Sequence, residues 1–581
     1  MTPSLRLLLE DFLGLMREEG ELDVFLPLLM SAMGHEVVYR AQKGTRQYGV
    51  DISSVGQDED GKKKLFLWLV KCGDINRSDW NSGPQAIRQS IDDVGDTYLR
   101  SHVAPQHFNL PKKLLIITNG DFNASLIQTI AGFLEDWSRQ KGVEAMTVNG
   151  STLAAWTEHY LLDEYVLPAS NRALLRRMLA NVNSPELCIS VGHTLFDSMV
   201  KGAKEPARSK AARMKRLLTG LRGVRTALSV LQVWAHNENN LLAPYRLAEF
   251  AVLSVWANLH DEVSKGDRTV IQEFADLLIQ LTTIAEAYHQ RIQPYYVTQN
   301  AFAHALPDNL LVTDAVFQEI GRIGLQGYIW AAQAVESKNE LAAQMAGLYT
   351  NRLIALLSSH SCSQSPSYDY HATDIHVGLL LLALANRKAD AKIWVRHMVL
   401  RLGHVANKPK FWPLSAPFEE ALLIRHGYEE MSEEFLATST LIPVLLIWTA
   451  ALGMDDAFHF IRDRILPLIP QTTPNFWSPD KGFDELVANP MALQQHGVGE
   501  AVLSISTKPE QFIRKMSAPL PGVESIEEAI WQKVRAEYVP LLAALRWQLQ
   551  VPREMMVKQA IGAAGYIFPC ASASATASAD E

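Results

Sequence analysis

Three consecutive segments give the clearest structural signal in the first part of the chain: YGVDISSVG (48–56), QDEDGKK (57–63) and KLFLWLVKC (64–72). Two runs rich in Val, Ile, Leu and aromatic residues flank a polar segment with the turn signal Asp60-Gly61, so the pattern predicts a β-hairpin. Lys71 is unexpected after so apolar a run, because a buried strand has no reason to carry an unpaired ammonium group. Asp51, on the neighbouring strand, could share a metal and a water with it: the carboxylate would hold Mg²⁺ and the lysine would stabilise the nucleophile.

The register of the hairpin decides whether Asp51 and Lys71 share a face. Their numbers add to an even number, so a shared face requires a loop with an odd number of residues. A two-residue Asp60-Gly61 turn would place the two side chains on opposite faces. A loop of three or five residues with Gly61 in the left-handed conformation would align them, and we expect such a loop.

Further predicted strands and helices alternate on both sides of the hairpin. The segments 36–41, 113–118 and 144–148 have strand composition, and 3–18, 22–33, 83–100, 122–140 and 151–165 have helical patterns. A meander of three strands followed by crossover units predicts an α/β domain, a mixed central sheet flanked by helices, over residues 1–168.

The remainder of the chain has a different pattern. After residue 170 apolar residues recur at helical spacing, which predicts a large all-α, helical-array region over 169–570, as one body or two subdomains. No fixed repeat length is found, so no repeat family is assigned. The segment 571–581 is of low complexity and is expected to be disordered.

Two smaller features lie in the helical region. The segments KPKFWPLSAP (408–417) and TTPNFWSPDKG (473–483) resemble each other and predict loops whose aromatic residues fill gaps between helices, with paired recognition loops as the alternative. A group of His, Cys and Asp residues between His360 and His376 fits no metal-binding spacing, so a surface loop is favoured over a zinc site.

The totals narrow the classes of function. The net charge is −9 and the pI about 6.0, which argues against a protein that coats nucleic acid through overall basicity but leaves room for a local basic patch. Hydrophobic residues make up 48%, enough for large cores. The four cysteines lie far apart without a CxxC pair, which argues against a disulfide framework or a zinc ribbon.

Targeting and nucleotide-binding signals are missing. The start MTPSLRLLLEDFLGLMREEGE has acids within its apolar run, unlike a signal peptide, and the most apolar stretch, 441–454, is too short to span a bilayer. We therefore expect a soluble, cytoplasmic protein with no membrane partner. Neither GxxxxGK[ST] nor GxGxxG after a strand occurs, so any ATPase would be separately encoded.

A basic stretch follows the predicted α/β domain. Between residues 201 and 225 there are nine Lys and Arg residues and one acid, Glu205. Several phosphate contacts from such a stretch would give salt-dependent binding to nucleic acid that is independent of base sequence. The alternative is a solvated helix face. The residues that we select as candidates for DNA binding are Lys204, Arg208, Lys210, Arg213, Lys215 and Arg216.

The order of motifs in residues 1–168 resembles a known superfamily. A helix with an acid, then Gly-x-Asp-Ile on a strand, then an apolar strand ending in Lys, then a helix with Gln is similar to the PD-(D/E)xK nucleases, above all their Mrr-type restriction-endonuclease-like branch. The first helix of that branch, Gly-x-Phe-Glu followed by an apolar run to a Gly, is similar to GELDVFLPLLMSAMGHEVVY (20–39), with Asp23 in the place of the acid and Glu21 as the alternative.

The resemblance implies roles for particular residues. The signature Asp and Lys of the family match Asp51 and Lys71, so they would hold Mg²⁺ or Mn²⁺ and orient the attacking water. In the next helix, Gln85 and Gln89 would face the sheet near the cleft, with Gln85 the stronger catalytic candidate. The resemblance says nothing about the residues after 168.

One position departs from the family pattern. The family has Glu, Asp or Gln two residues before the signature Lys, and this chain has Leu69, which cannot bind a metal. Either Asp74, Glu21 or Asp23 supplies the missing ligand, or the site is degenerate and the domain binds DNA without cutting it. A third hypothesis is that the match to the motif is coincidental and that Lys71 merely extends from the strand end into solvent.

These observations lead to two hypotheses about function. The first is a metal-dependent nuclease that cuts DNA, an effector of a bacterial anti-phage defence or restriction system, whose helical region senses a trigger or docks on a partner such as an ATPase or sensor protein. The second is a catalytically degenerate, DNA-binding scaffold subunit of a multiprotein complex. A weaker third hypothesis is a helical regulatory protein whose first domain serves only to dimerise; a homo-oligomer is compatible with all three.

Overall fold

The computed structural model describes residues 6, 9–10, 13–14, 16–18, 22–40, 48–82, 86–161, 169–202, 209–478, 498–502, 505–518 and 529–565. Contacts within the chain divide it into two units, Met1–Ala248 (unit 1) and Glu249–Glu581 (unit 2). In the ranges just given, no helix combines the length and the apolar character that crossing a membrane requires.

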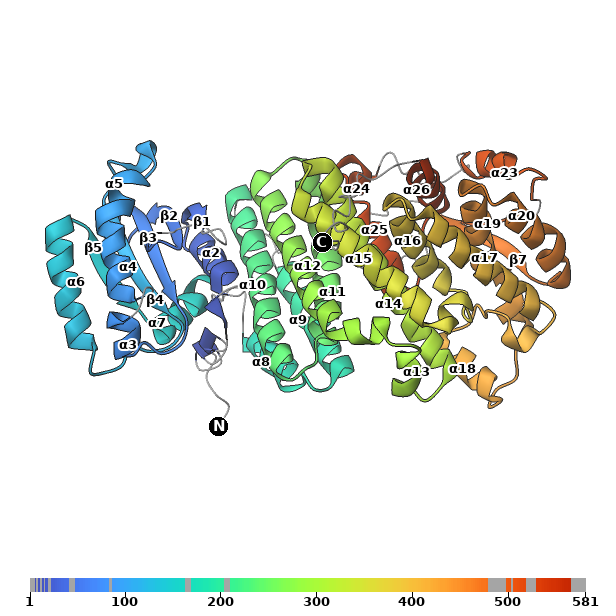
Figure 1. Cartoon of the computed structure of the whole chain (residues 1–581), viewed down its shortest axis with the longest axis horizontal. Helices are drawn as coiled ribbons and strands as arrows, with labels where there is room; N and C mark the ends of the chain where they lie inside the picture. The colour runs from blue at the N-terminus through green and yellow to red at the C-terminus, as the bar shows by residue number, and fades with distance from the viewer. Residues whose placement is uncertain are drawn as a thin grey trace, which may run out of the picture. The chain divides into compact units, whose positions relative to one another are not determined.

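Unit 1 is built on a five-stranded mixed sheet, as predicted (Figure 1). The first three strands form an antiparallel meander, and the last two run parallel to the third. Along the sheet the strands follow chain order: β1 (Glu36–Arg40), β2 (Ile52–Gln57), β3 (Lys63–Lys71), β4 (Lys112–Thr118) and β5 (Glu144–Val148).

Helices connect the parallel strands and cover the sheet. Parallel neighbours need crossover connections, and these are helical. The helices from β3 to β4 are α3 (Arg77–Asn81), α4 (Ile87–Asp93), the π-helix η2 (Val94–Tyr98) and α5 (Leu99–Ser101), followed by the short 3-10 turn η3 (Pro105–His107). The helix from β4 to β5 is α6 (Ile127–Lys141). Before β1 the chain forms α2 (Asp23–Ala32), and after β5 it forms α7 (Gly150–Trp156) and the π-helix η4 (Thr157–Leu161).

Each face of the sheet has its own core. Alternate residues of β3 and β4 pack against α4 and α6 in one cluster, which includes Leu67, Leu69 and Ile116. The other face carries Phe66 and Trp68, against which the ring of His35 packs just after α2. Because both faces are covered, β3 has an almost continuous apolar sequence instead of an alternating one.

Unit 1 continues into long helices. They are α8 (Ala169–Ala180), α9 (Pro185–Gly202) and α10 (Lys210–Asn237). Helix α10 contacts α2 and η4 of the α/β part. The division between the units falls within α11 (Leu242–Ser264).

Unit 2 is a large helical region, and its central helix α14 (Asn309–Ser337) packs against α15 (Glu340–Ser359) and α16 (His371–Leu384). Gly324 and Gly327 allow the close approach of α14 to α16, because a Cβ atom on either would lie 3.0 Å from Val377 or 2.4 Å from Leu381. The other helices are α12 (Arg268–Val297), α13 (Ala301–Ala305), α17 (Lys388–Val405), α18 (Phe418–His426), α19 (Leu441–Ala451), α20 (Asp455–Phe460), α23 (Pro509–Met516), α24 (Ile530–Lys533), α25 (Tyr538–Trp547) and α26 (Arg553–Gly565).

Unit 2 is not entirely helical, which corrects the all-α prediction. Three short strands form a second sheet: β6 (Thr438–Ser439), β7 (Thr473–Ser478) and β8 (Val498–Ala501). The sequence signal of β7 was missed because Pro474 lowers strand propensity and the run is short. The predicted loop at 473–483 is therefore partly a strand, and its Phe476 is buried, as is Trp412 of the similar segment, whereas Phe411 is exposed.

The prediction of a surface loop around His360 to His376 is wrong. His360, His371 and His376 are all buried, the last two on α16. The ring of His376 accepts a hydrogen bond from Trp448 Nε1 at 3.1 Å and contacts Gln559 Oε1 at 3.0 Å, and burial lowers its pKa to about 4. Polar residues were taken as a sign of exposure, but a histidine such as His376 can be buried where other buried side chains satisfy its ring nitrogens. The predicted disordered tail lies outside the described residues.

Candidate functional site

The hairpin places Asp51 and Lys71 on one face of the sheet. Ile52 pairs with Trp68 and Gln57 with Lys63, which leaves a five-residue loop with Gly61 at φ +77°. Extending this register by one residue sets Asp51 opposite Leu69, so the side chains of Asp51, Leu69 and Lys71 project to the same side. The predicted odd-length loop with a left-handed glycine is therefore confirmed.

Asp51 is half-buried, and a backbone hydrogen bond holds its carboxylate. Its Oδ2 accepts a hydrogen bond from the backbone N–H of Val70 at 2.7 Å. Burial raises the pKa of Asp51; the hydrogen bond from Val70 and the charge of Lys71 lower it, and the charge of Glu18 raises it, so the pKa lies above its ordinary value. The charges of Lys71 and Glu18 thus both act on the Asp51 carboxylate at this edge of the sheet.

Gly49 determines where Asp51 lies. Its φ is +80°, and a Cβ atom there would lie 2.1 Å from the backbone oxygen of Ser90 in α4. Only glycine accepts both the backbone conformation and the close approach. The Gly-x-Asp spacing therefore fixes the start of β2 against α4, and with it the Asp51 carboxylate.

This close approach can be measured. Replacing Gly49 by alanine is expected to lower the free energy of unfolding of unit 1 by about 2 kcal/mol, through left-handed strain plus a backbone clash. The matched control is Gly61→Ala, at φ +77° but with no heavy atom nearer than 4.0 Å to the new Cβ, which should cost only about 1 kcal/mol. Hydrogen exchange of β2 and β3 peptides in urea would compare the two variants. Equal losses of unfolding free energy would show that the close approach of Gly49 to α4 contributes nothing.

Asn119 connects three segments at the carboxyl end of the parallel strands. It is 3% exposed and follows β4. Its Oδ1 accepts a hydrogen bond from Gly73 N–H at 2.7 Å, and its Nδ2 donates to Leu13 O at 2.6 Å and to Met16 O at 2.8 Å. Asn119 therefore ties the ends of β3 and β4 to the segment that carries Glu18.

The other predicted acids lie apart from this pair. Asp23 is the first residue of α2 and is exposed. Asp74 is also exposed, and its Oδ1 accepts a hydrogen bond from the backbone N–H of Asp121 at 2.8 Å. Over the described ranges, no three or more His, Cys, Asp or Glu side chains form a group that could hold a metal ion. Glu21 lies outside the described residues.

Two further motif positions behave differently from the family pattern. Leu69 is 1% exposed and belongs to the core cluster with α4 and α6, so it fills space at the position where the family has a ligand. Gln89 is exposed, because Ile87 and Ile91 are the residues of α4 that face the core; the expectation that Gln89 faces the sheet is wrong. Gln85 lies outside the described residues.

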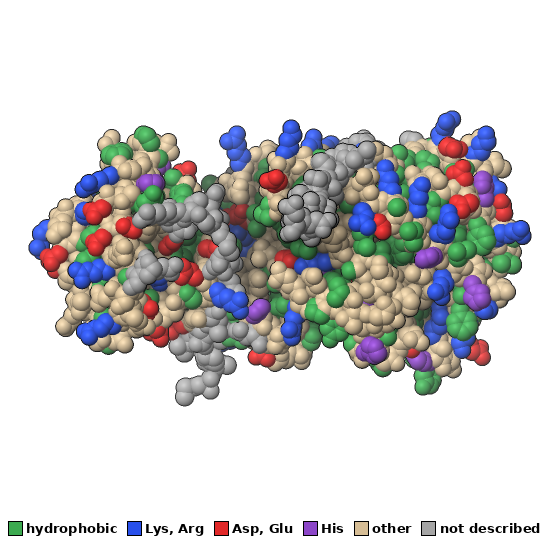
Figure 2. Space-filling model, in the orientation of Figure 1, with side chains coloured by type: hydrophobic (Ala, Val, Ile, Leu, Met, Phe, Trp, Pro, Cys, Tyr) green, Lys and Arg blue, Asp and Glu red, His purple; other side chains and the backbone are tan. Residues whose placement is uncertain are grey.

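The basic stretch is only partly described. Lys204 and Arg208 lie outside the described residues, and Lys210 begins α10. Arg213 and Lys215 are exposed on α10, and Arg216 is half-buried. On the face drawn in Figure 2, blue Lys and Arg side chains are interspersed with red Asp and Glu.

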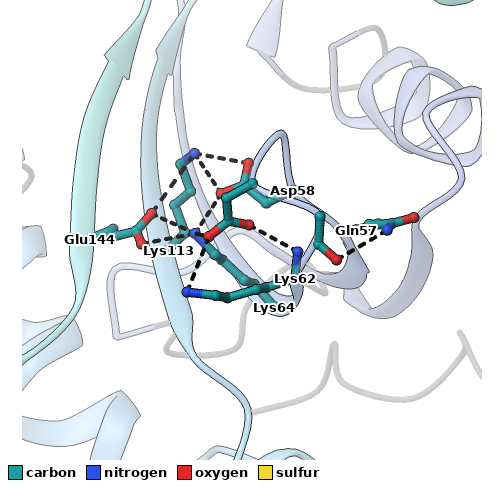
Figure 3. A network of polar contacts seen from close by, with 8 residues as sticks. Gln57, Asp58, Lys62, Lys64, Lys113 and Glu144 are labelled. Atoms are coloured by element: carbon teal, nitrogen blue, oxygen red, sulfur yellow. Dashed lines mark hydrogen bonds and ion pairs between the residues drawn. The ribbon is translucent and has the colours of Figure 1, made fainter.

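An ion-pair cluster that sequence reasoning missed lies at the opposite end of the strands (Figure 3). Lys64 of β3 is 2% exposed, and its Nζ lies 2.7 Å from Asp58, 3.1 Å from Asp60 and 2.8 Å from Glu144 of β5. Lys113 of β4 contacts Asp58 at 3.0 Å. Burial alone would raise the pKa of Asp58, but the hydrogen bonds from the two lysines outweigh it and lower the pKa to about 2.

Two missed site residues differ in the signal that could have found them. Asn119 stands in Thr118-Asn119-Gly120 directly after a predicted strand, a position where polar residues are often functional. Glu18 had no such signal, since it lies at the end of a predicted helix and is brought towards Asp51 only by the fold.

Comparisons of this chain with protein-family models, with curated proteins and with solved structures find no match.

Proposed function

We propose that the α/β part of unit 1 is a metal-dependent nuclease that hydrolyses phosphodiester bonds in DNA. The whole chain would be an effector of an anti-phage defence or restriction system, and its helical region would dock a partner. The observation that supports it most is the pairing of Asp51 and Lys71 on one face of adjacent strands. A half-buried carboxylate with a raised pKa near an ammonium group is typical of catalytic sites.

Each residue has a part in this chemistry. Lys71 would orient the attacking water and stabilise the negative charge that develops on the phosphate. The hydrogen bond from Val70 fixes one oxygen of Asp51 and leaves the other available. Asp51 and Glu18 would hold Mg²⁺ or Mn²⁺, which usually takes one or two carboxylates and keeps several waters. The metal would supply positive charge at the phosphate.

Cleavage of supercoiled and linear DNA with Mg²⁺ or Mn²⁺ tests this proposal. Asp51→Asn and Lys71→Met are each expected to lower the rate at least about a hundredfold, because each removes a charge from the reacting centre. The matched controls are Asp136→Asn and Lys63→Met, exposed residues of unit 1 away from Asp51, which should cut like the wild type.

A second readout separates binding of metal from activity. Mn²⁺ is expected to raise the melting temperature of the wild type and of Asp136→Asn, but not of Asp51→Asn. If Mn²⁺ stabilises no variant and no DNA is cut in either metal, the nuclease proposal fails.

A second candidate is a degenerate nuclease domain that binds DNA as a scaffold. The buried Leu69 favours this candidate, because the hydrocarbon side chain of leucine cannot bind a metal at the position where the family has a ligand. Here, charge reversal of Arg213, Lys215 and Arg216 to Glu is expected to weaken DNA binding and to reduce its salt dependence by about 0.9 in log–log slope for each phosphate that is no longer neutralised. Fluorescence anisotropy with a labelled duplex at several salt concentrations measures both quantities, and unchanged binding would exclude this surface.

A further inference from the structure

Strand β5 forms an open edge of the unit 1 sheet. It pairs with β4 on one side and stands last in the strand order, so among the described residues no strand pairs with the backbone groups on its other side (Figure 1). Only Val148 of its five residues is buried, and Met146 is 37% exposed. The edge is short and regular, with no proline to prevent pairing.

Helix α6 extends beyond this edge. The residues of α6 that line the groove beside β5 follow helical spacing, so they form one face: Ile127, Ile130, Ala131, Leu134, Glu135 and Ser138. Ile130 and Leu134 are buried over the sheet, whereas Ile127 is 54% exposed and Ala131 is also exposed. The volume of the groove is about 910 Å³. One wall is thus an apolar helix face, and the other is the edge strand.

The charged groups of the groove are mostly negative. Its carboxylates are Asp121, Glu135 and Glu144, all on exposed residues. Its lysine, Lys113, is half-buried and held by Asp58 at 3.0 Å. Glu135 forms a surface ion pair with Arg139, and Glu144 shares Lys64 with Asp58 and Asp60, so the carboxylates still outnumber the cations. A second copy of this groove would bring like charges together, and nucleic acid would be repelled. A basic partner is the electrostatic complement.

We propose that this groove binds an extended, basic segment of a partner protein as a sixth strand on β5. Backbone hydrogen bonds to the free edge would supply affinity, and alternate side chains would enter the groove under α6. On the α6 face of the sheet, where Ala145 lies, apolar side chains of the bound strand would contact Ile127 and Ala131. The alternate Lys or Arg side chains would lie on the opposite face, beside Glu144 and Met146.

The groove reaches the carboxyl end of the strands. Asp121 lines it there, and this residue donates its backbone N–H to Asp74 Oδ1 while its Oδ1 accepts from Asn149 Nδ2 at 2.9 Å. A strand bound along the whole groove would therefore reach Asp121, which this hydrogen bond connects to Asp74. The proposal does not depend on the nuclease proposal, because it concerns peptide binding alone.

Fluorescence anisotropy of synthetic peptides with the full-length protein tests the proposal. The probe is a labelled peptide of the length of β5 in which Val alternates with Lys; the comparison peptides carry Glu for Lys, or Pro for Val to prevent strand pairing. The Val/Lys peptide is expected to bind at least about tenfold more tightly than either comparison peptide. Ile127→Lys and Met146→Lys should each weaken its binding at least about fivefold.

The matched control is Val38→Lys on β1, the other edge strand, where the side chain is 38% exposed. This variant should bind the Val/Lys peptide like the wild type. Equal binding of all three peptides, or equal effects of the lysine at 38 and at 146, would overturn the proposal. So would a dimer in light scattering that Met146→Lys dissociates, because the occupant would then be a second copy of the chain.

Discussion

Replacing Lys64 by methionine is expected to lower the free energy of unfolding of unit 1 by about 3 to 4 kcal/mol, because removing one partner of a buried ion pair leaves the other charge uncompensated. The Asp58 side chain is 9% exposed and would keep Lys113 as its remaining cation in the cluster. The side chains of Asp60 and Glu144 are more exposed, so losing their ion pairs with Lys64 should contribute little to the lost unfolding free energy. Urea unfolding followed by hydrogen exchange of β3, β4 and β5 peptides measures the effect.

The control is Lys62→Met, two residues away. Its side chain is 73% exposed and lies 3.9 Å from Asp60, so its replacement should change stability by less than about 0.5 kcal/mol. Equal effects of the two substitutions would show that the cluster in Figure 3 contributes no more than a surface pair.

The effect of Lys64→Met should depend on pH. The pKa of Asp58 is about 2 in the folded protein and higher in the unfolded chain, so its contribution is complete above the unfolded pKa. It is lost as the pH falls from about 4 towards 2, where folded Asp58 takes up its proton. The difference between wild type and variant is therefore expected to be constant above about pH 5 and to shrink below it.

The second large effect concerns Glu319 on α14, which is 2% exposed. Tyr288 and Tyr296 each donate a hydroxyl hydrogen bond to it at 2.6 Å, and Arg322 forms an ion pair with it. Burial raises the pKa of Glu319, but the Arg322 charge, the contribution of His289 and the two hydroxyls outweigh this and hold it below the ordinary value. The carboxylate is therefore charged and its partners are arranged around that charge.

Replacing Glu319 by leucine is expected to lower the free energy of unfolding of unit 2 by about 3 to 5 kcal/mol, because two hydroxyls and a guanidinium group are then left without this buried acceptor. Glu336→Leu on the same helix is the control, since that side chain is 46% exposed and should change stability by less than about 0.5 kcal/mol. Hydrogen exchange of α14 and α12 peptides in urea gives both values. A loss below about 1 kcal/mol for Glu319→Leu would contradict the role assigned to this cluster.

Local patterns carried the prediction of the unit 1 sheet. The apolar run of β3, the Asp-Gly turn and the crossover helices each depend on short-range physics, and together they predicted a mixed sheet made of a meander followed by crossover units. The parity of residues 51 and 71 required a loop of three or five residues if their side chains were to share a face, because side-chain direction in a strand alternates. The observed loop has five. The strands of unit 2 were missed because β6 is two residues long and β7 contains Pro474.

The contacts around the candidate site could not be predicted as fully. Asp51 and Lys71 are joined by a hairpin and were found from the sequence. Glu18 and Asn119 come from segments far apart in the chain, and no local pattern indicates that they meet. The same holds for Lys64 and Glu144, whose pairing depends on β5 lying near β3 across β4.

Asn119 also has a consequence for the order in which unit 1 folds. Its hydrogen bonds to Leu13 and Met16 close loops of more than a hundred residues, whereas the β2–β3 hairpin closes a loop of five. Long loops cost more chain entropy, so contacts between distant segments form late. The hairpin that carries Asp51 and Lys71 is thus expected to pair first, and the segment bearing Glu18 to dock only once β3 and β4 lie side by side. A chain paused during folding would hold a paired sheet in which the charge of Glu18 does not yet act on Asp51.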